Sequence, residues 1–305
     1  MSSDTARPRV AFAGLGAIGL PMARHLAGNT DLVVWNRTAA KASRFAAETG
    51  ARMAGTPAAA ATGAEFFFLC LPTSADSEAV LFGPDGAAGV MLRGSVVIDC
   101  TSGDPATSRR IAERLALMGI SFVDAPVSGG VVGAVAGKLT VMAGGDPETL
   151  ERARPILTLF AAKIVHCGAV GTGDAVKAAN NALLAVHIWS TAEVLAAVCK
   201  LGVDPAVALD VINASSGRSN SSMNLIPERV LDGSFPRTFR LALLDKDVRI
   251  AADLARETGT PAELLDLTAR LFAEAHAELG EAADHVEAVR VVEGRAGVTI
   301  RSRTP

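Results

Sequence analysis

Residues 9–26 read RVAFAGLGAIGLPMARHL and decide the fold of the first half of the chain. A short β-rich run leads directly into Gly14, Gly16 and Gly19, and an amphipathic helical stretch follows. In a dinucleotide-binding βαβ unit, the first glycine permits a tight turn, the second lets a pyrophosphate approach the backbone, and the third lets helix and strand pack closely. The helix N-terminus then offers N–H groups to the anion. We therefore predict a nucleotide-binding turn formed by Gly14, Leu15, Gly16, Ala17, Ile18 and Gly19.

Strands and helices continue to alternate up to about residue 170. Such alternation is typical of βαβ units and a mostly parallel sheet. We expect strands at 10–13, 32–35, 66–71, 96–99, 121–124, 139–143 and 164–166. Helices fit between them, for example at 20–27, 39–49 and 106–118.

Beyond residue 170 the strand signals stop and apolar residues recur at helical spacing. We therefore predict an α/β domain over residues 1–169 and an all-α domain over residues 170–305. The first helix of the second domain is apolar nearly all round and about 40 Å long, so we expect most of its faces to be buried, between the domains and against a second subunit. Helices are expected near 174–200, 205–214, 222–231, 241–258, 261–278 and 283–294.

Composition narrows the classes of function. The 305 residues carry a formal net charge of −3 and no Tyr, and no basic stretch is present, so nucleic-acid binding is not expected. The four cysteines form no CxxC pair and the five histidines share no metal-ligand spacing, so we expect a reduced, cytoplasmic setting and no metal. No uninterrupted apolar run is long enough to span a bilayer, and the N-terminus lacks the apolar core of a signal peptide.

The second expected strand ends in VVWNRTAAK, at the position where an NAD site carries an acidic residue for the ribose hydroxyls. Here Asn36 is followed by Arg37 and Thr38. Loss of a carboxylate and gain of a guanidinium favour a 2'-phosphate, because the forked donors of arginine match phosphate geometry. We therefore expect NADP in preference to NAD, with Lys41 as a second positive charge. The alternative is that Arg37 is a solvated surface residue.

Two further loops follow expected strands at the edge where open α/β sheets bind ligands. In CLPTSADSEAV, Leu71 and Pro72 offer an apolar wall to adenine or ribose. In DCTSGDPATSRR, Thr101 and Ser102 offer hydroxyl groups near a nicotinamide. A turn followed by a helix N-cap explains these residues equally well.

A candidate substrate site follows the fifth expected strand, in DAPVSGG. Ser128 stands beside Gly129 and Gly130, so a hydroxyl and backbone N–H groups can share a small concavity that suits a carboxylate. A purely structural loop is the alternative.

The first helix of the second domain begins GTGDAVKAANN and keeps Lys177 and Asn181 on one face. Burying an unpaired ammonium is costly, so stability alone explains Lys177 poorly. In a half-apolar cleft its pKa would fall towards neutrality, which suits a general acid or base at a carbonyl that becomes an alkoxide. Asn181 would orient Lys177 or hold the substrate. The alternative is that Lys177 extends from the helix start into solvent.

Four motifs in this order resemble the β-hydroxyacid dehydrogenases, which include 3-hydroxyisobutyrate dehydrogenase and tartronate semialdehyde reductase. GLGAIGLPMA is similar to the nucleotide signature of that family, DAPVSGG to its substrate signature and GTGDAVKAANN to its catalytic helix. LLDKDVRIA is similar to the helix that closes on the cofactor. The resemblance runs nearly end to end, and four ordered motifs are far more specific than any one of them.

The resemblance implies roles for these residues. Lys177 would be the catalytic acid or base, and Ser128, Gly129 and Gly130 would hold the substrate carboxylate, with Asn181 nearby. It also implies a Rossmann domain followed by a helical domain, usually assembled into homodimers or homotetramers.

Four more residues take roles from the resemblance. Lys246 matches a lysine that approaches cofactor and substrate, and Asp247 is its usual neighbour at the cofactor. From the pattern alone, this charged pair indicates only a solvated helix face. Phe239 lies where the family often has an aromatic residue in the pocket. Ser102 occupies a hydroxyl position that is usually Thr, and the local run is T-S-G instead of S-T-I.

We therefore expect an NADP-preferring oxidoreductase that interconverts a small β-hydroxyacid and its semialdehyde or ketone. Imine reductases resemble this architecture but usually replace the catalytic lysine, so Lys177 favours carbonyl chemistry. A nucleotide-binding module without catalysis is a second alternative, against which Lys177 and the Ser128 loop argue. The polar segment SSGRSNSSMNLIP, with Arg218, Asn220 and Asn224, offers further contacts to substrate oxygens.

Overall fold

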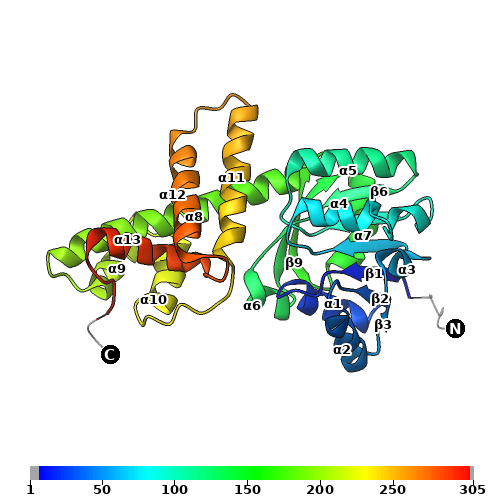
Figure 1. Cartoon of the computed structure of the whole chain (residues 1–305), viewed down its shortest axis with the longest axis horizontal. Coiled ribbons are helices and arrows are strands. Elements are labelled where there is room, and N and C mark those ends of the chain that lie inside the picture. The colour runs from blue at the N-terminus through cyan, green and yellow to red at the C-terminus, as the bar shows by residue number, and fades with distance from the viewer. Residues whose placement is uncertain (1–6, 303–305) are drawn as a thin grey trace. The chain divides into compact units, whose positions relative to one another are not determined.

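The computed structural model describes residues 7–302, which divide into two compact units, one ending at Lys177 and the other beginning at Ala178 (Figure 1). Within the described residues, the first unit holds a nine-stranded sheet in the order β3-β2-β1-β4-β5-β6-β8-β7, with β9 beside β8. The strands are β1 (Arg9–Ala13), β2 (Asp31–Trp35), β3 (Arg52–Met53), β4 (Phe66–Leu69), β5 (Val96–Asp99), β6 (Ser121–Asp124), β7 (Val127–Ser128), β8 (Leu139–Gly145) and β9 (Ala161–Gly168).

The sheet is mostly parallel, as the sequence predicts. The pairings among β1 to β6 are all parallel, and so is the pairing of β8 with β9. β8 runs antiparallel to both β6 and β7. The two short strands β3 and β7 were not expected, because two residues are too few to show an alternating pattern.

Helices cover both faces of this sheet. α1 (Gly19–Ala27), α2 (Ala39–Thr49), α6 (Gly130–Val135) and α7 (Pro147–Leu157) pack into one buried cluster. α3 (Pro57–Ala61), α4 (Ser74–Phe82) and α5 (Pro105–Leu117) pack into the other. Burial on both faces accounts for the continuous apolar runs of the central strands.

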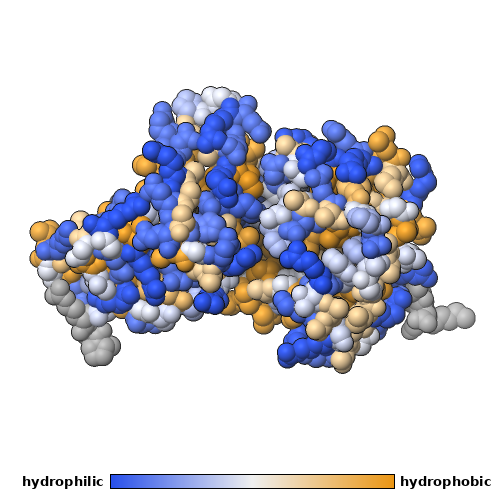
Figure 2. All heavy atoms as spheres, viewed as in Figure 1, coloured by the Kyte–Doolittle hydropathy of each residue, from blue (hydrophilic) through white to orange (hydrophobic). Residues whose placement is uncertain are grey.

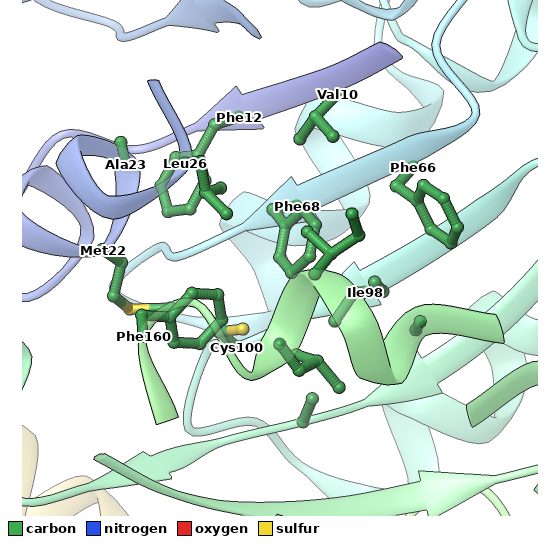
Figure 3. Packing of buried hydrophobic residues seen from close by; sticks show 14 of the residues in the cluster. Val10, Phe12, Met22, Ala23, Leu26, Phe66, Phe68, Ile98, Cys100 and Phe160 are labelled. Carbon is green, nitrogen blue, oxygen red and sulfur yellow. The ribbon is translucent and has the colours of Figure 1, made fainter. Parts of the chain in front are cut away.

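Alternate residues of neighbouring strands serve the two clusters. Phe12 of β1 and Phe68 of β4 share one face, with stacked ring centroids 6.0 Å apart (Figure 3). Met22 and Leu26 of α1 belong to the same cluster. Phe67, one residue earlier than Phe68, belongs to the opposite cluster. The nucleotide-binding turn between β1 and α1 is thus anchored in a dense core.

The second unit contains helices over its described residues. α8 (Thr172–Lys200) begins in the first unit and contributes Ile188 and Trp189 to the core of the second, where the Trp189 ring lies 5.8 Å from that of Phe272. The remaining elements are α9 (Pro205–Asn213), a π-helical turn η2 (Ser221–Leu225), α10 (Ile226–Arg229), α11 (Leu241–Glu257), α12 (Glu263–Leu279), a 3-10 turn η3 (His285–Glu287) and α13 (Ala288–Ala296).

Within the single chain α8 is buried along one face, and its burial between the domains and against a second subunit stays a prediction. Val176, Leu183 and Val194 leave 44%, 56% and 50% of their surface exposed. The buried face is the one that includes Ile188 and Trp189. The helix therefore packs along one face, although its sequence is apolar nearly all round. In Figure 2, apolar residues reach the surface at the end of the helical unit, over α8 and α9.

α8 also meets the length and composition of a membrane span. Its most apolar window has a mean hydropathy of 1.7, and 44% of that window is buried. Single helices of this kind also occur as core helices of soluble proteins. The buried face of α8 forms part of the core of the second unit, which supports that explanation here.

Candidate active site

The three glycines of the nucleotide-binding turn have different reasons to lack a side chain. Gly14 has φ +104°, and a Cβ there would lie 2.2 Å from the carbonyl oxygen of Cys70. A Cβ at Gly19 would lie 2.0 Å from the oxygen of Gly14. No atom lies within 4 Å of a Cβ placed at Gly16, so the backbone there faces open space. α1 also has no side-chain cap at Ile18. This cradle fits a dinucleotide pyrophosphate.

Asn36 follows β2 and holds this turn in place. Its Oδ1 accepts a hydrogen bond from the Leu15 N–H at 2.9 Å, and its Nδ2 donates to the Thr38 carbonyl at 3.0 Å. Arg37 is different, because 82% of its side chain is exposed and its Nη1 lies 3.4 Å from Asp76 Oδ1. An exposed, loosely paired guanidinium is available to a phosphate.

The loops after β4 and β5 are joined by a threonine. Thr101 is 2% exposed, and its hydroxyl accepts a hydrogen bond from the Leu71 N–H at 3.0 Å. Its own N–H donates to Asp99 at 2.9 Å. Leu71 and Ser102 are half-buried and Pro72 is exposed. Thr101 therefore connects the two loops, and the Ser102 hydroxyl is the more accessible of the pair.

The candidate carboxylate site has an open geometry. Ser128 ends β7 opposite Thr140 of β8. Gly129 and Gly130 follow with φ +130° and +62°, conformations that favour glycine. Both glycines are exposed, and no atom lies within 4 Å of a Cβ placed at Gly130. The backbone at this turn is therefore accessible to a small ligand.

Two buried carboxylates hold the start of α8. Asp124 is fully buried and accepts hydrogen bonds from the N–H groups of Gly171 at 2.8 Å and Asp174 at 3.0 Å. Asp174 is 2% exposed and accepts from the Gly103 N–H at 2.9 Å and the Ser108 hydroxyl at 2.6 Å. Burial raises the pKa of Asp124. Burial, and then the charge of Asp124, raise the pKa of Asp174 well above its usual range.

Neither aspartate was singled out from the sequence. Asp124 opens the DAPVSGG motif at the end of a buried strand, and Asp174 stands in the first turn of a helix, so each had a positional signal. Asp124 accepts from the backbone of Gly171 and Asp174, and Asp174 accepts from that of Gly103. These partners lie 47 to 71 residues away along the chain. Only the folded structure brings these groups together.

A second polar group lies in the helical unit. Asn181, 3% exposed, donates through Nδ2 to Asp247 Oδ2 at 2.6 Å and accepts from Asn180 at 3.1 Å. Lys246 Nζ lies 2.9 Å from Asp247 Oδ1. The structure thus joins buried Asn181 and Asp247 with half-buried Lys246 in one network. Lys177 is half-buried and precedes Asn181 by one turn of α8.

Phe239 lies just before α11 and is half-buried. Its ring packs edge-on against His285, with centroids 5.4 Å apart. Its N–H and that of Thr238 donate to Asp284 at 2.8 and 2.6 Å. The segment that leads into α11 is therefore firmly held, and with it the position of the aromatic ring.

Two family models cover most of the chain. Residues 9–168 match the NAD-binding domain of 6-phosphogluconate dehydrogenase. Residues 171–292 match the NAD-binding domain of NADP-dependent 3-hydroxyisobutyrate dehydrogenase. The first match alone spans more than half of the chain, and the second begins at α8.

Individual relatives agree with these matches. The chain is 35% identical to the human mitochondrial 3-hydroxyisobutyrate dehydrogenase, over 88% of this chain and 82% of the human protein. It is 32% identical to 2-(hydroxymethyl)glutarate dehydrogenase of Eubacterium barkeri, over 96% and 97%. A solved 3-hydroxyisobutyrate dehydrogenase of Mycobacterium tuberculosis, with L-serine, has a TM-score of 0.85 at 30% identity and covers 94% of this chain and 99% of its own.

More distant structures share the fold alone. An imine reductase of Streptomyces aurantiacus has a TM-score of 0.60 at 20% identity, over 93% of this chain and 98% of its own. The family models and the closer relatives confirm the resemblance carried by the four sequence motifs. The chain therefore belongs to the β-hydroxyacid dehydrogenase family and is an NAD(P)-dependent oxidoreductase acting on CH–OH groups.

Proposed function

We propose that the enzyme prefers NADP and interconverts a small β-hydroxyacid and its semialdehyde or ketone. The observation that carries the proposal is the polar face of α8, where half-buried Lys177 stands one turn before Asn181 and the amide of Asn181 is fixed by buried Asp247. The solved relative with L-serine supports the substrate class, because serine is itself a small β-hydroxy carboxylate.

Each of the two domains predicted from the sequence takes one part of the reaction. We assign the dinucleotide to residues 1–169, with the glycine cradle and Asn36 shaping its site. Residues 170–305 supply the catalytic helix and the oligomer contacts. The exposed Arg37 supports NADP, as does the NADP-dependent enzyme named in the match to residues 171–292.

Proton transfer is the task of Lys177. When bound, NADP supplies or accepts the hydride at the carbinol carbon. In the direction of reduction, the Lys177 ammonium donates a proton to the carbonyl oxygen as negative charge develops there. In the direction of oxidation, the neutral amine takes the hydroxyl proton. Asn181, held by Asp247, orients the amine and the reacting oxygen.

Substrate orientation is the task of the other candidate residues. Ser128, Gly129 and Gly130 hold the carboxylate through a hydroxyl and backbone N–H groups. Phe239 closes the pocket on the apolar side of the substrate. Lys246, which is paired with Asp247, would approach cofactor and substrate, as the family resemblance implies.

We propose a cytoplasmic homodimer or homotetramer. The apolar residues that α8 and α9 leave exposed, among them Leu183 and Val207, support association through the helical unit. A single-chain mass in sedimentation equilibrium at micromolar concentration would contradict the oligomer.

The decisive experiment compares Lys177→Ala with the wild type on a panel of β-hydroxyacids, semialdehydes and cyclic imines, with each cofactor. Loss of a general acid or base is expected to lower kcat by about 10²–10⁴-fold. NADPH binding, followed by its fluorescence, should be unchanged. Lys200→Ala, at the exposed end of the same helix, is the matched control.

Two results would contradict the proposal. Full turnover of a carbonyl substrate by Lys177→Ala would remove the proton-transfer role. Faster turnover of cyclic imines than of any carbonyl compound by the wild type would favour imine reduction instead.

A further inference from the structure

The structure assigns Asp174 as a positioning residue whose carboxylate ties the start of α8, and with it Lys177, to the loop that carries Ser102. The inference rests on the proposed function of Lys177. It concerns a residue to which the sequence motifs assigned no role. All the groups involved lie in the first unit, of which Lys177 is the last residue.

The Asp174 carboxylate forms hydrogen bonds with two other segments of the first unit. Its Oδ1 accepts from the Gly103 N–H at 2.9 Å, and its Oδ2 accepts from the Ser108 hydroxyl at 2.6 Å. Gly103 follows Ser102 directly, and Ser108 lies in the first turns of α5. A single side chain on α8 therefore holds both the loop after β5 and the helix that follows it.

The second line of support is the space around the carboxylate. A Cβ at Gly103 would lie 3.0 Å from Asp174 Oδ2 and 3.2 Å from Oδ1, so the glycine leaves the room that the carboxylate fills. A Cβ at Gly173 would lie 2.3 Å from the Met142 carbonyl oxygen and 2.9 Å from Asp124 Oδ2. The structure therefore leaves little room for a side chain at either Gly103 or Gly173.

The third line of support is that the helix start is held from two strands at once. Asp124, at the end of β6, accepts the N–H groups of Gly171 and Asp174. Asp174 in turn reaches the loop after β5. With two buried anchors on neighbouring strands, the first turn of α8 has a fixed position and a fixed rotation about its axis.

The fixed first turn of α8 also sets the position of Lys177. It follows Asp174 by three residues, or about 4.5 Å along the helix axis, on an adjoining face. A misplacement of about 1 Å at a reacting group can cost about 100-fold in rate. Releasing the Asp174 anchor is therefore expected to act on kcat through Lys177, while the glycine cradle for the cofactor is left intact.

The kinetics of three variants separate loss of the Asp174 hydrogen bonds from loss of its negative charge. Asp174→Ala removes both hydrogen bonds and is expected to lower kcat about tenfold or more, with the KM for NADPH changed less than about twofold. Asp174→Asn keeps an oxygen for the Gly103 N–H and an amide for the Ser108 oxygen, so it should restore kcat to within about threefold of the wild type. Gly103→Ala retains Asp174 but crowds its carboxylate, and should lower kcat in the same direction as Asp174→Ala.

The matched control is Asp146→Ala. Asp146 stands at the start of α7 in the same unit and accepts from the N–H and the hydroxyl of Thr149, both at 2.8 Å. It is thus an aspartate at a helix start with the same kind of partners, away from the proposed site. Its removal should lower the stability of the fold and leave kcat unchanged.

Hydrogen–deuterium exchange tests the same inference without turnover. Asp174→Ala should raise exchange in both segments 101–108 and 171–180, whereas Asp146→Ala should raise it in neither. Unchanged exchange at 171–180 would overturn the positioning role, as would a folded Asp174→Ala enzyme with wild-type kcat, or an Asp174→Asn enzyme as slow as Asp174→Ala. A wild-type enzyme that oxidises no hydroxyacid would overturn the proposed function instead, and the exchange result would still decide the role of Asp174.

Discussion

Asn36 illustrates how a single side chain can serve a site without facing its ligand. The position follows the second strand, where the absence of a carboxylate predicts NADP. In the structure its amide oxygen is taken by the Leu15 N–H, so Asn36 stabilises the turn that would bind the pyrophosphate. We therefore expect the choice between the two cofactors to depend on Arg37, whose guanidinium is exposed.

Arg37→Ser should therefore weaken NADPH specifically. Losing a charge-assisted contact to the 2'-phosphate is expected to raise the KM for NADPH about tenfold or more, since hydrogen bonds to charged groups contribute about 1.5–3 kcal/mol. The KM for NADH should change little, because NADH has no phosphate at that position. Arg44→Ser on α2, equally exposed and paired with Glu48, serves as the control. Equal effects on both cofactors would contradict a 2'-phosphate contact.

Asp99→Asn tests the electrostatic cost of the buried carboxylates. Burial raises the pKa of Asp99 from 3.8 to about 6, although hydrogen bonds from Thr101 oppose the shift. The folded state therefore holds a proton that the unfolded state releases, and stability falls as pH rises from about 4 to about 6. The shift corresponds to about 3 kcal/mol.

Asparagine does not ionise, so the substitution should remove this loss. Urea unfolding of Asp99→Asn and wild type at pH values of about 4 and about 8 measures it. The mutant should gain stability relative to wild type at the higher pH. A difference between the two proteins that is the same at both pH values would show that Asp99 ionises normally.

Sequence motifs identify residues whose chemistry is visible in their type and spacing. Gly14, Gly16 and Gly19 were predicted because each glycine has a backbone reason that the spacing reveals. Asp124 and Asp174 were not, because an aspartate followed by a helix or a loop has many ordinary explanations. What distinguishes Asp174 is its contact with Gly103, 71 residues away, and local pattern carries no information about that separation.

At the scale of whole elements, the best-predicted strands are those buried on both faces. β5 and β6 have the predicted bounds, because continuous apolar runs mark central parallel strands. β8 and β9 are longer than predicted, since their ends contain glycine and polar residues. Within the single chain α8 buries one face, and a sequence that is apolar nearly all round gives no indication of which face that is.

One contact between elements links the nucleotide helix to the substrate turn. His25 of α1 lies with Nε2 3.0 Å from the Ala134 carbonyl and 3.2 Å from the Val135 carbonyl, at the end of α6. Gly137 packs against the same ring, where a Cβ would lie 3.2 Å from Cε1. α6 begins at Gly130, so this contact steadies the turn proposed to hold the carboxylate.

His25→Ala should therefore weaken substrate binding more than cofactor binding. We expect the KM for the hydroxyacid to rise about three- to tenfold, as for the loss of one hydrogen bond that contributes about 1 kcal/mol. The KM for NADPH should stay within about twofold of the wild type. Asn29→Ala, just beyond the end of α1, is the control. A larger effect on NADPH than on the hydroxyacid would assign His25 to the cofactor side.

At the scale of the whole molecule, we expect most of the cofactor site to belong to the first unit, around the glycine cradle. Binding to the folded state alone stabilises a protein by about 2.7 kcal/mol when the ligand is at about 100 times its Kd. NADP⁺ at that excess should raise the midpoint of thermal unfolding of the first unit by roughly 5–10 °C. NAD⁺ at the same concentration should give a smaller shift, measured by calorimetry. A larger shift with NAD⁺ would reverse the cofactor preference.

The carboxylates beneath the start of α8 also affect folding itself. Asp99, Asp124 and Asp174 all have pKa values raised by burial. In mildly acidic solution the native chain keeps protons that its disordered form would surrender to the medium. Folding of this enzyme therefore takes up protons under those conditions. Its apparent unfolding enthalpy should therefore vary with the ionisation heat of whichever buffer accepts the released protons.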